Sequence, residues 1–147
     1  MKIKKMIFLL VASTGLVFGL FVRDDYGVVE DDKSGLAWQD NYSDNNGEIK
    51  EGTWQDALVY CHELILEDKN DWRLPNRNEL LSLTDIKLFN PSINDIFQNT
   101  ISEYYWSSTT QSEITTGAWP VNFNNGDSNW NQKSEIYYIR CVRGGEE

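Results

Sequence analysis

Two cysteines, Cys61 and Cys141, lie about 80 residues apart, and their chemical state constrains the fold more than any other feature of the sequence. In an oxidising compartment, two cysteines most simply form one disulfide. Such a bond would join the middle of the chain to its end and contribute about 4–5 kcal/mol in the chain-entropy model. The alternative is a catalytic thiolate at Cys61 beside His62. That arrangement is disfavoured because both residues lie in a predicted helix, where adjacent side chains point about 100° apart, and no third group is evident to orient the imidazole.

The N-terminus predicts that the chain is exported. Three lysines within the first five residues precede the uncharged stretch Met6–Val22, a pattern typical of a secretory signal. We expect residues 1–19 to be this signal, with cleavage after Gly15 or Gly19, and an uncleaved anchor is the alternative. No cysteine lies near the segment, so a lipoprotein anchor is excluded. The rest of the chain is expected in the periplasm, at the cell surface or in the medium, where the disulfide is favoured.

The charge of the chain excludes several classes of partner. The formal net charge is −10, and without residues 1–20 it becomes −13, from 10 Lys and Arg against 23 Asp and Glu. So acidic a protein repels phosphate backbones and anionic lipids, and we therefore expect no nucleic-acid partner and no membrane insertion beyond the signal segment. One histidine and two cysteines also argue against a zinc cage or a histidine-based triad, and we predict no metal ligands.

The length and composition predict one folded domain. The chain has 147 residues, 40% of them hydrophobic, with 6 Trp, 7 Tyr and 6 Phe, which is enough to bury a core. After the signal, the short apolar stretches Gly27–Glu30 and Leu36–Trp38 flank a polar turn and predict a β-hairpin. Residues 39–52 are rich in Asn, Asp, Ser and Gly and predict a loop.

Two helices are predicted in the middle of the chain. Residues 54–66 carry apolar side chains at helical spacing, and Thr53 and Asp56 form a capping pair at their start. A second capping pair, Asn76 and Glu79, opens a short leucine-rich helix. Both helices are therefore expected to begin at side-chain caps.

The last third of the chain predicts strands. Aromatic and β-branched residues dominate three runs, namely Tyr104–Thr110, Ala118–Phe123 and Ile136–Val142. Pro120 lacks an amide donor, which places the middle run at an edge or a bulge. In the last run, Tyr137, Ile139 and Cys141 share one face, which would direct Cys141 into the core. The fold class is therefore α+β, with two helices packed on mostly antiparallel short strands.

Six stretches of the sequence resemble the Lcl C-terminal domain family, named for the C-terminal domain of a bacterial collagen-like adhesin. They follow one another in the family's order and cover nearly all of residues 23–144: VVEDDKSGLAW (28–38), TWQDALVYCHEL (53–64), DWRLPNRNELLSL (71–83), YWSST (105–109), AWPVNFNNG (118–126) and RCVRG (140–144). The resemblance implies a C-type-lectin-like fold that binds extracellular ligands, with glycans the leading class.

The same resemblance bears on three further points. Cys61 and Cys141 fall at the two cysteine positions of the family, which supports the disulfide. The Arg-Leu-Pro sequence at 73–75 is similar to a signature of formylglycine-generating enzymes, a related branch, and Arg73 is expected to pair with a carboxylate near this turn. The collagen-like adhesin is associated with sulfated polysaccharides. This chain has no collagen repeat and is strongly acidic, so an anionic polymer is a poor candidate ligand.

The stretch 122–132 is the candidate ligand-binding loop. Sugars are bound by an aromatic platform beside amide and carboxylate groups, and this loop has five Asn, one Asp and one Trp around Gly126. The predicted ligand contacts are Asn122, Asn124, Asp127, Asn129, Trp130 and Asn131. The other five tryptophans lie within the family motifs and are expected in the core: Trp38, Trp54, Trp72, Trp106 and Trp119. The alternative for Trp130 is that it covers the disulfide end of the sheet.

A cofactor and an enzymatic activity are both disfavoured by the sequence. Asp40–Glu48 and Asn122–Asn131 offer oxygen atoms to Ca²⁺, but neither follows the EF-hand order, and solvated turns are the simpler interpretation. No nucleophile, base or carboxylate pair is singled out by spacing. We therefore predict a non-enzymatic glycan-binding module without a cofactor. The alternatives are an envelope structural or protein-interaction domain and an oxidative enzyme related to formylglycine generation.

Overall fold

The predicted hairpin forms the centre of the first sheet. The computed structural model describes residues 20–145, so the predicted signal at residues 1–19 lies outside the described residues. The antiparallel sheet contains β1 (Phe21–Arg23), β2 (Val28–Asp31), β3 (Leu36–Gln39) and β10 (Val142–Arg143), in the order β1-β2-β3-β10. The hairpin is thus completed on one side by β1 and on the other by β10, the last strand of the described residues.

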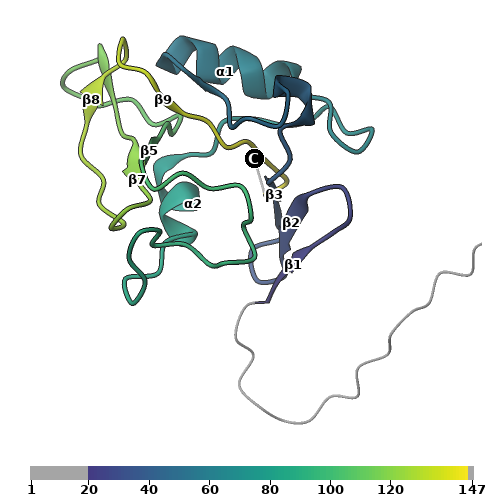
Figure 1. Ribbon diagram of the computed structural model, residues 1–147. Helices are drawn as coiled ribbons and strands as arrows, with labels where there is room; N and C mark the ends of the chain where they lie inside the picture. The colour runs from purple at the N-terminus through teal and green to yellow at the C-terminus, as the bar shows by residue number, and fades with distance from the viewer. Residues whose placement is uncertain (1–19, 146–147) are drawn as a thin grey trace, which may run out of the picture.

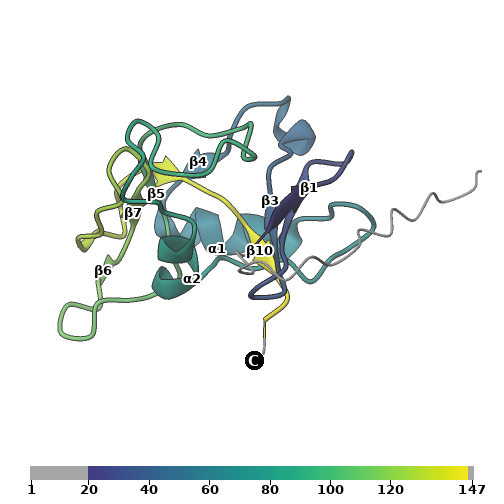
Figure 2. The ribbon, with the colours of Figure 1, turned by 90° about the horizontal axis from the view of Figure 1, so that it is seen from below.

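A second sheet lies on the opposite side of the molecule (Figures 1 and 2). Its order is β4-β9-β5-β7, and a separate ribbon pairs β6 with β8. The strands are β4 (Glu51–Gly52), β5 (Tyr104–Tyr105), β6 (Gly117–Ala118), β7 (Val121–Asn122), β8 (Asn131–Gln132) and β9 (Tyr137–Tyr138). All pairs are antiparallel except β5 with β9, so the α+β class with mostly antiparallel short strands is confirmed.

The strands are shorter than the sequence predicts. Only Tyr104–Tyr105 of the first predicted run forms a strand. The second run is divided at Trp119–Pro120, where proline has no amide to continue the ladder. The third run is divided because its two ends belong to different sheets, β9 to the second and β10 to the first. The C-terminal segment 137–143 therefore links the two sheets.

Both helices begin at the predicted caps. In α1 (Trp54–Glu63) the Thr53 side chain accepts from the Asp56 amide, and the Asp56 side chain accepts from the Thr53 amide. Asn76 and Glu79 do the same for α2 (Arg77–Ser82). The first helix ends three residues before the predicted end, because Leu64 turns to an extended conformation with ψ 128° and is buried. A short 3-10 helix, η1 (Ser43–Asn45), lies in the predicted loop.

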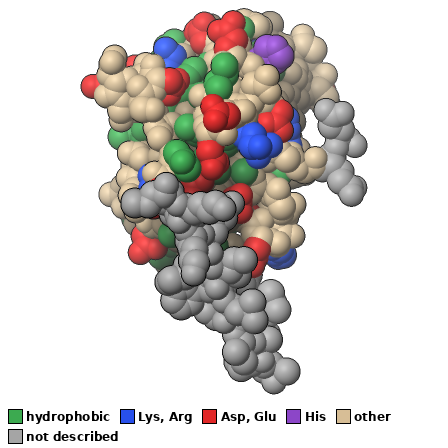
Figure 3. Space-filling model, turned by 90° about the vertical axis from the view of Figure 1, so that its right-hand side faces the viewer, with side chains coloured by type: hydrophobic (Ala, Val, Ile, Leu, Met, Phe, Trp, Pro, Cys, Tyr) green, Lys and Arg blue, Asp and Glu red, His purple; other side chains and the backbone are tan. Residues whose placement is uncertain are grey.

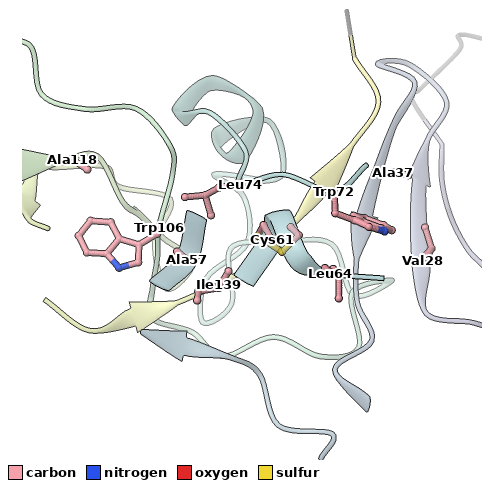
Figure 4. Close-up of a cluster of buried hydrophobic side chains, with 11 residues drawn as sticks. Val28, Ala37, Ala57, Cys61, Leu64, Trp72, Leu74, Trp106, Ala118 and Ile139 are labelled. Atoms are coloured by element: carbon pink, nitrogen blue, oxygen red, sulfur yellow. A yellow bond between two sulfur atoms is a disulfide. The ribbon is translucent and has the colours of Figure 1, made fainter. Parts of the chain in front are cut away.

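The disulfide between Cys61 and Cys141 is confirmed and lies at the centre of one core cluster (Figure 4). The two Cα atoms are 5.4 Å apart and both residues are fully buried. Trp72 lies on one side of the bond and Trp106 on the other, with Ile139 beneath α1. Both thiols are therefore used in a cross-link between α1 and the C-terminal segment, and a free catalytic thiolate at Cys61 is ruled out.

The β2–β3 hairpin separates two core clusters because its side chains alternate between its faces. Val28 and Ala37 belong to the cluster around the disulfide, whereas Val29 and Trp38 belong to a second cluster together with residues of α2 and β7. Ile139 and Cys141 share the disulfide side as predicted, and Val142 faces the second cluster. No helix within residues 20–145 is long and apolar enough to cross a membrane.

Three of the five tryptophans expected in the core are buried, and two are only partly so. Trp38, Trp72 and Trp106 are at most 3% exposed. Trp54 and Trp119 are partly exposed, and each is covered by a cation: Lys133 Nζ lies 3.8 Å from the Trp54 ring, and Arg77 Cζ lies 4.2 Å from the Trp119 ring. Trp54 still packs against the cluster around the disulfide, whereas Trp119 packs against neither cluster, so the expected core position was wrong for Trp119.

The first prediction concerns the disulfide. The double variant Cys61→Ala/Cys141→Ala should lose about 2–5 kcal/mol of unfolding free energy, because the cross-link restricts an unfolded loop of 80 residues. Urea unfolding of the oxidised protein, the reduced protein and the double variant measures this loss. Equal urea midpoints for the three forms would contradict the role assigned to the bond.

Arg73 forms the predicted ion pair, and its partner is Glu79. Arg73 Nη1 and Nη2 donate to the two carboxylate oxygens at 2.8 and 2.7 Å, and Nη2 also donates to the carbonyl of Gly144 at 2.9 Å. Glu79 therefore caps α2 and orients Arg73 at once. Burial alone would raise the pKa of Glu79, but the hydrogen bonds from Arg73 and from the amide of Asn76 together hold that pKa below its ordinary value.

The second prediction follows from this carboxylate. Because its pKa is lowered in the folded state, its stabilisation is present above the unfolded pKa of about 4.3 and is lost as the pH falls through the folded value. Glu79→Gln should lower the unfolding free energy at pH 7 by about 1–3 kcal/mol, and the difference from the wild type should shrink near pH 3. Denaturant titrations at both pH values test this, with the exposed Glu113→Gln as the matched control.

Candidate functional site

The predicted ligand loop begins in β7 and ends in β8, and a tight turn occupies its first half. The amide of Asn122 donates to the carbonyl of Asp127 at 2.8 Å, and the amide of Gly126 donates to the carbonyl of Asn122 at 2.8 Å. Gly126 adopts a φ of 83°, which favours glycine. The side-chain oxygen of Asn122 accepts from the Asn124 amide at 2.8 Å. Asn122 therefore shapes the turn.

The remaining polar residues of the loop differ in what their side chains contact. Asn125 Nδ2 donates to Asp127 Oδ2 at 2.7 Å, and the Asp127 amide donates to Asn125 Oδ1 at 3.1 Å. Asn131 Nδ2 donates to the carbonyl of Asn129 at 3.4 Å. The side chains of Asn124 and Asn129 form no hydrogen bond with residues 20–145. Of the predicted polar contacts, these two are the ones whose amide groups remain open to a ligand.

Trp130 is the exposed aromatic residue of the loop, with 37% of its surface accessible. Its ring lies over Gly117 of β6, where an added Cβ would stand 2.8 Å from Trp130 Cε3. Only glycine at 117 leaves room for the ring in this position. Trp130 is not among the residues packed around the disulfide, so its contact is with the β6–β8 ribbon.

A second set of contacts fixes the loop to α2. Arg77 stacks on Trp119, and its Nε donates to Ser128 Oγ at 3.0 Å. Ser128 Oγ in turn donates to the carbonyl of Pro120 at 2.8 Å. The loop is therefore attached to the scaffold on both sides of Gly126, and Trp130 projects from a supported segment.

Two acidic residues in the stretches considered for Ca²⁺ are bonded to other protein groups. The carboxylate of Asp40 is buried and is bonded to the guanidinium groups of Arg23 and Arg140, so it is neither solvated nor open to a metal. In the 122–131 stretch, Asp127 is bonded to Asn125 within the turn. Within the described part of the chain, no three His, Cys, Asp or Glu residues are placed to hold a metal ion.

A groove of about 640 Å³, which sequence reasoning missed, lies away from the predicted loop. We call it the Tyr138 groove. Its lining comes from the 45–51 segment and from residues 98–101, which we call its two walls, and from Tyr138 of β9. The groove escapes a search for local motifs because its lining comes from three segments of the chain.

Buried charges hold one wall of the Tyr138 groove. Asp40 Oδ2 and Oδ1 accept from the amides of Gln98 and Asn99 at 2.9 and 3.1 Å. Arg140 Nη2 donates to the carbonyl of Asn99 at 2.6 Å and to Thr100 Oγ1 at 2.9 Å. The sequence holds one indication of this buried ion pair, namely Arg140, a charged residue between the core positions Ile139 and Cys141.

A second, more apolar groove of about 690 Å³ runs along α1. We call it the α1 groove. Leu58, Val59 and His62 line its helical side, and Trp72 and Leu74 line the other. Val59 is 44% exposed in it.

The fold and these surfaces define a disulfide-linked α+β domain that presents an exposed tryptophan and two surface grooves. A comparison with protein-family models matches residues 27–143 to the Lcl C-terminal domain. The match covers most of the chain, and the protein belongs to this family. A search of curated proteins finds no match.

Proposed function

We propose that this protein is an exported, non-enzymatic glycan-binding module with a C-type-lectin-like fold, whose ligand contacts lie in the 122–132 loop. The observation that supports it most is Trp130, an exposed ring held over Gly117. An aromatic face of this kind packs against the C–H groups of a sugar ring, while amides bond to its hydroxyls. Asn124 and Asn129 provide such amides in the same loop.

Export is supported by the disulfide, since such bonds persist in oxidising compartments. We also propose that the fold is related to that of formylglycine-generating enzymes. Its sequence signature at 73–75 has a structural role here, because Arg73 is bonded to Glu79 and to the carbonyl of Gly144. That role does not call for the chemistry of those enzymes.

The charge of the protein favours an uncharged glycan. The net charge is −10, and Asp and Glu side chains are also spread over the face that carries the β1–β3 sheet (Figure 3). An anionic polysaccharide would be repelled by this field at moderate salt concentration. Neutral glycans are therefore the expected class.

The third prediction tests the loop directly. Trp130→Ala should reduce binding on a glycan array at least tenfold, the equivalent of about 1.4 kcal/mol, because the stacking face is lost while the fold remains. Tyr26→Ala is the matched control, since Tyr26 is 61% exposed in the β1–β2 turn on the opposite side of the molecule. Circular dichroism and melting should be unchanged in both variants.

Two results would contradict the proposal: no glycan signal for the wild type, or equal loss in both variants. Adding EDTA should leave binding unchanged, because the described residues assemble no cluster of acidic ligands for Ca²⁺. Loss of binding in EDTA that added Ca²⁺ restores would show that the glycan site depends on the ion.

The α1 groove is the observation that favours the alternative function, a protein-interaction or envelope structural domain. Partly exposed apolar side chains such as Val59 are typical of surfaces that bury area against another protein. Three results together would favour this alternative. The wild type would show no binding on the glycan array but would retain a purified envelope protein, Val59→Lys would abolish that retention, and Trp130→Ala would leave it intact.

A further inference from the structure

We propose that the Tyr138 groove is a second binding site, independent of Trp130, and that its ligand is a short uncharged saccharide. The groove measures about 640 Å³, within the usual range for small-ligand sites and large enough for a disaccharide. The groove shares no lining residue with the 122–132 loop.

The walls of the groove are preformed. The 98–101 wall is fixed by Asp40 and Arg140, as described above. In the opposite wall, the amides of Asn45 and Gly47 donate to the carbonyl of the buried Tyr42, and Asn45 Nδ2 donates to the carbonyl of Glu48 at 2.8 Å. A ligand would therefore enter a site that needs little ordering, which lowers the free-energy cost of binding.

Several polar side chains of the lining are open to a ligand, whereas those of Asn45, Asn99 and Thr100 are bonded within the walls. Those of Glu48, Lys50, Glu51 and Gln98 form no hydrogen bond or ion pair with the described residues. The Tyr138 hydroxyl likewise has no hydrogen bond within the described part of the chain, while its ring packs on Tyr105 with centroids 5.6 Å apart. Carboxylate, amide, ammonium and phenol groups together match the mixed donors and acceptors of sugar hydroxyls.

The groove fits a saccharide better than a peptide or an anion. A peptide strand would need a free sheet edge, and the nearby edge strand β4 has only two residues. The apolar parts of the lining are small, namely Ile49, Ile101 and the ring of Tyr138, and they offer contact to sugar C–H groups rather than a pocket for large side chains. Two carboxylates against one ammonium in the lining, on a protein of net charge −10, disfavour anionic ligands.

The fourth prediction tests this site with cellobiose, maltose and N,N′-diacetylchitobiose, and with a sulfated disaccharide of the same size. At least one neutral disaccharide should shift the backbone amide resonances of Gly47, Gln98 and Asn99 in a saturable titration. The sulfated disaccharide should bind at least tenfold more weakly. The proposal would be overturned if only the sulfated disaccharide gave saturable shifts. It would also be overturned if no neutral disaccharide shifted these amide resonances.

Variants separate this site from the 122–132 loop. Gln98→Ala/Tyr138→Phe removes one amide group and one hydroxyl while leaving the Gln98 backbone bond and the Tyr138 ring in place, and it should weaken groove binding at least tenfold. Gln55→Ala, an exposed glutamine on α1, is the matched control and should bind as the wild type does. Tyr138→Phe alone should weaken binding measurably, which keeps the test valid if the double variant unfolds.

The same titrations distinguish the two proposals. Trp130→Ala should leave the shifts at Gln98 and Asn99 unchanged, even if it abolishes binding at the loop. If Trp130→Ala abolishes the binding of neutral disaccharides while Gln98→Ala/Tyr138→Phe binds as the wild type does, the groove proposal fails and the loop proposal stands. If only the groove variants lose binding, the groove proposal stands and the loop proposal fails.

Discussion

The buried carboxylate of Asp40 and the buried guanidinium of Arg140 join segments that are far apart in the sequence. Asp40 accepts from Arg23 of β1, from Arg140 and from the amides of Gln98 and Asn99. Arg140 also stacks on Phe97, with its Cζ 4.7 Å from the ring centroid. A buried pair of this kind adds little net stability over an apolar pair, but removing one partner costs about 3–5 kcal/mol. The pair joins β1, the 98–101 segment and the C-terminal segment through direct hydrogen bonds.

The C-terminal segment 137–143 combines this polar cluster with the covalent cross-link. Tyr138 belongs to the second sheet, Arg140 to the polar cluster, Cys141 to the disulfide and Val142 to the core beneath the first sheet. One extended segment thus holds both sheets, and Tyr138 at its start lies in the groove proposed to bind saccharides. Irregular loops can then present ligand contacts in defined positions, because the scaffold beneath them is rigid.

Most parts of the fold that were predicted from the sequence depend on neighbouring residues, namely the caps at Thr53 and Asn76 and the β2–β3 hairpin. The long-range pairing of Cys61 with Cys141 was predicted because the chain has only two cysteines and export was expected. The pairing of Asp40 with Arg140 was not predicted, because the two residues are 100 positions apart and no local pattern links them. Strand lengths were also overestimated, since the β propensity of a run does not reveal where it changes sheets.

The candidate site was predicted in outline only. The loop and its exposed tryptophan are where the sequence placed them, and whether they bind a glycan stays a prediction. The side chains of Asn122 and Asp127 also form hydrogen bonds within the turn, and a count of polar residues does not reveal such bonds. The Tyr138 groove was missed because its walls, residues 45–51 and 98–101, meet only in the folded chain.

Asp40 is expected to hold the 98–101 wall of the Tyr138 groove in one conformation before any ligand binds. Native-state hydrogen exchange of the Gln98 and Asn99 amides tests this most directly, because both donate to the Asp40 carboxylate from a loop. Their opening free energies should approach that of global unfolding. The Lys87 amide, which donates to the exposed carboxylate of Asp85 at 2.9 Å, should exchange far faster. Exchange of Gln98 and Asn99 as fast as that of Lys87 would show that Asp40 does not hold this wall in place.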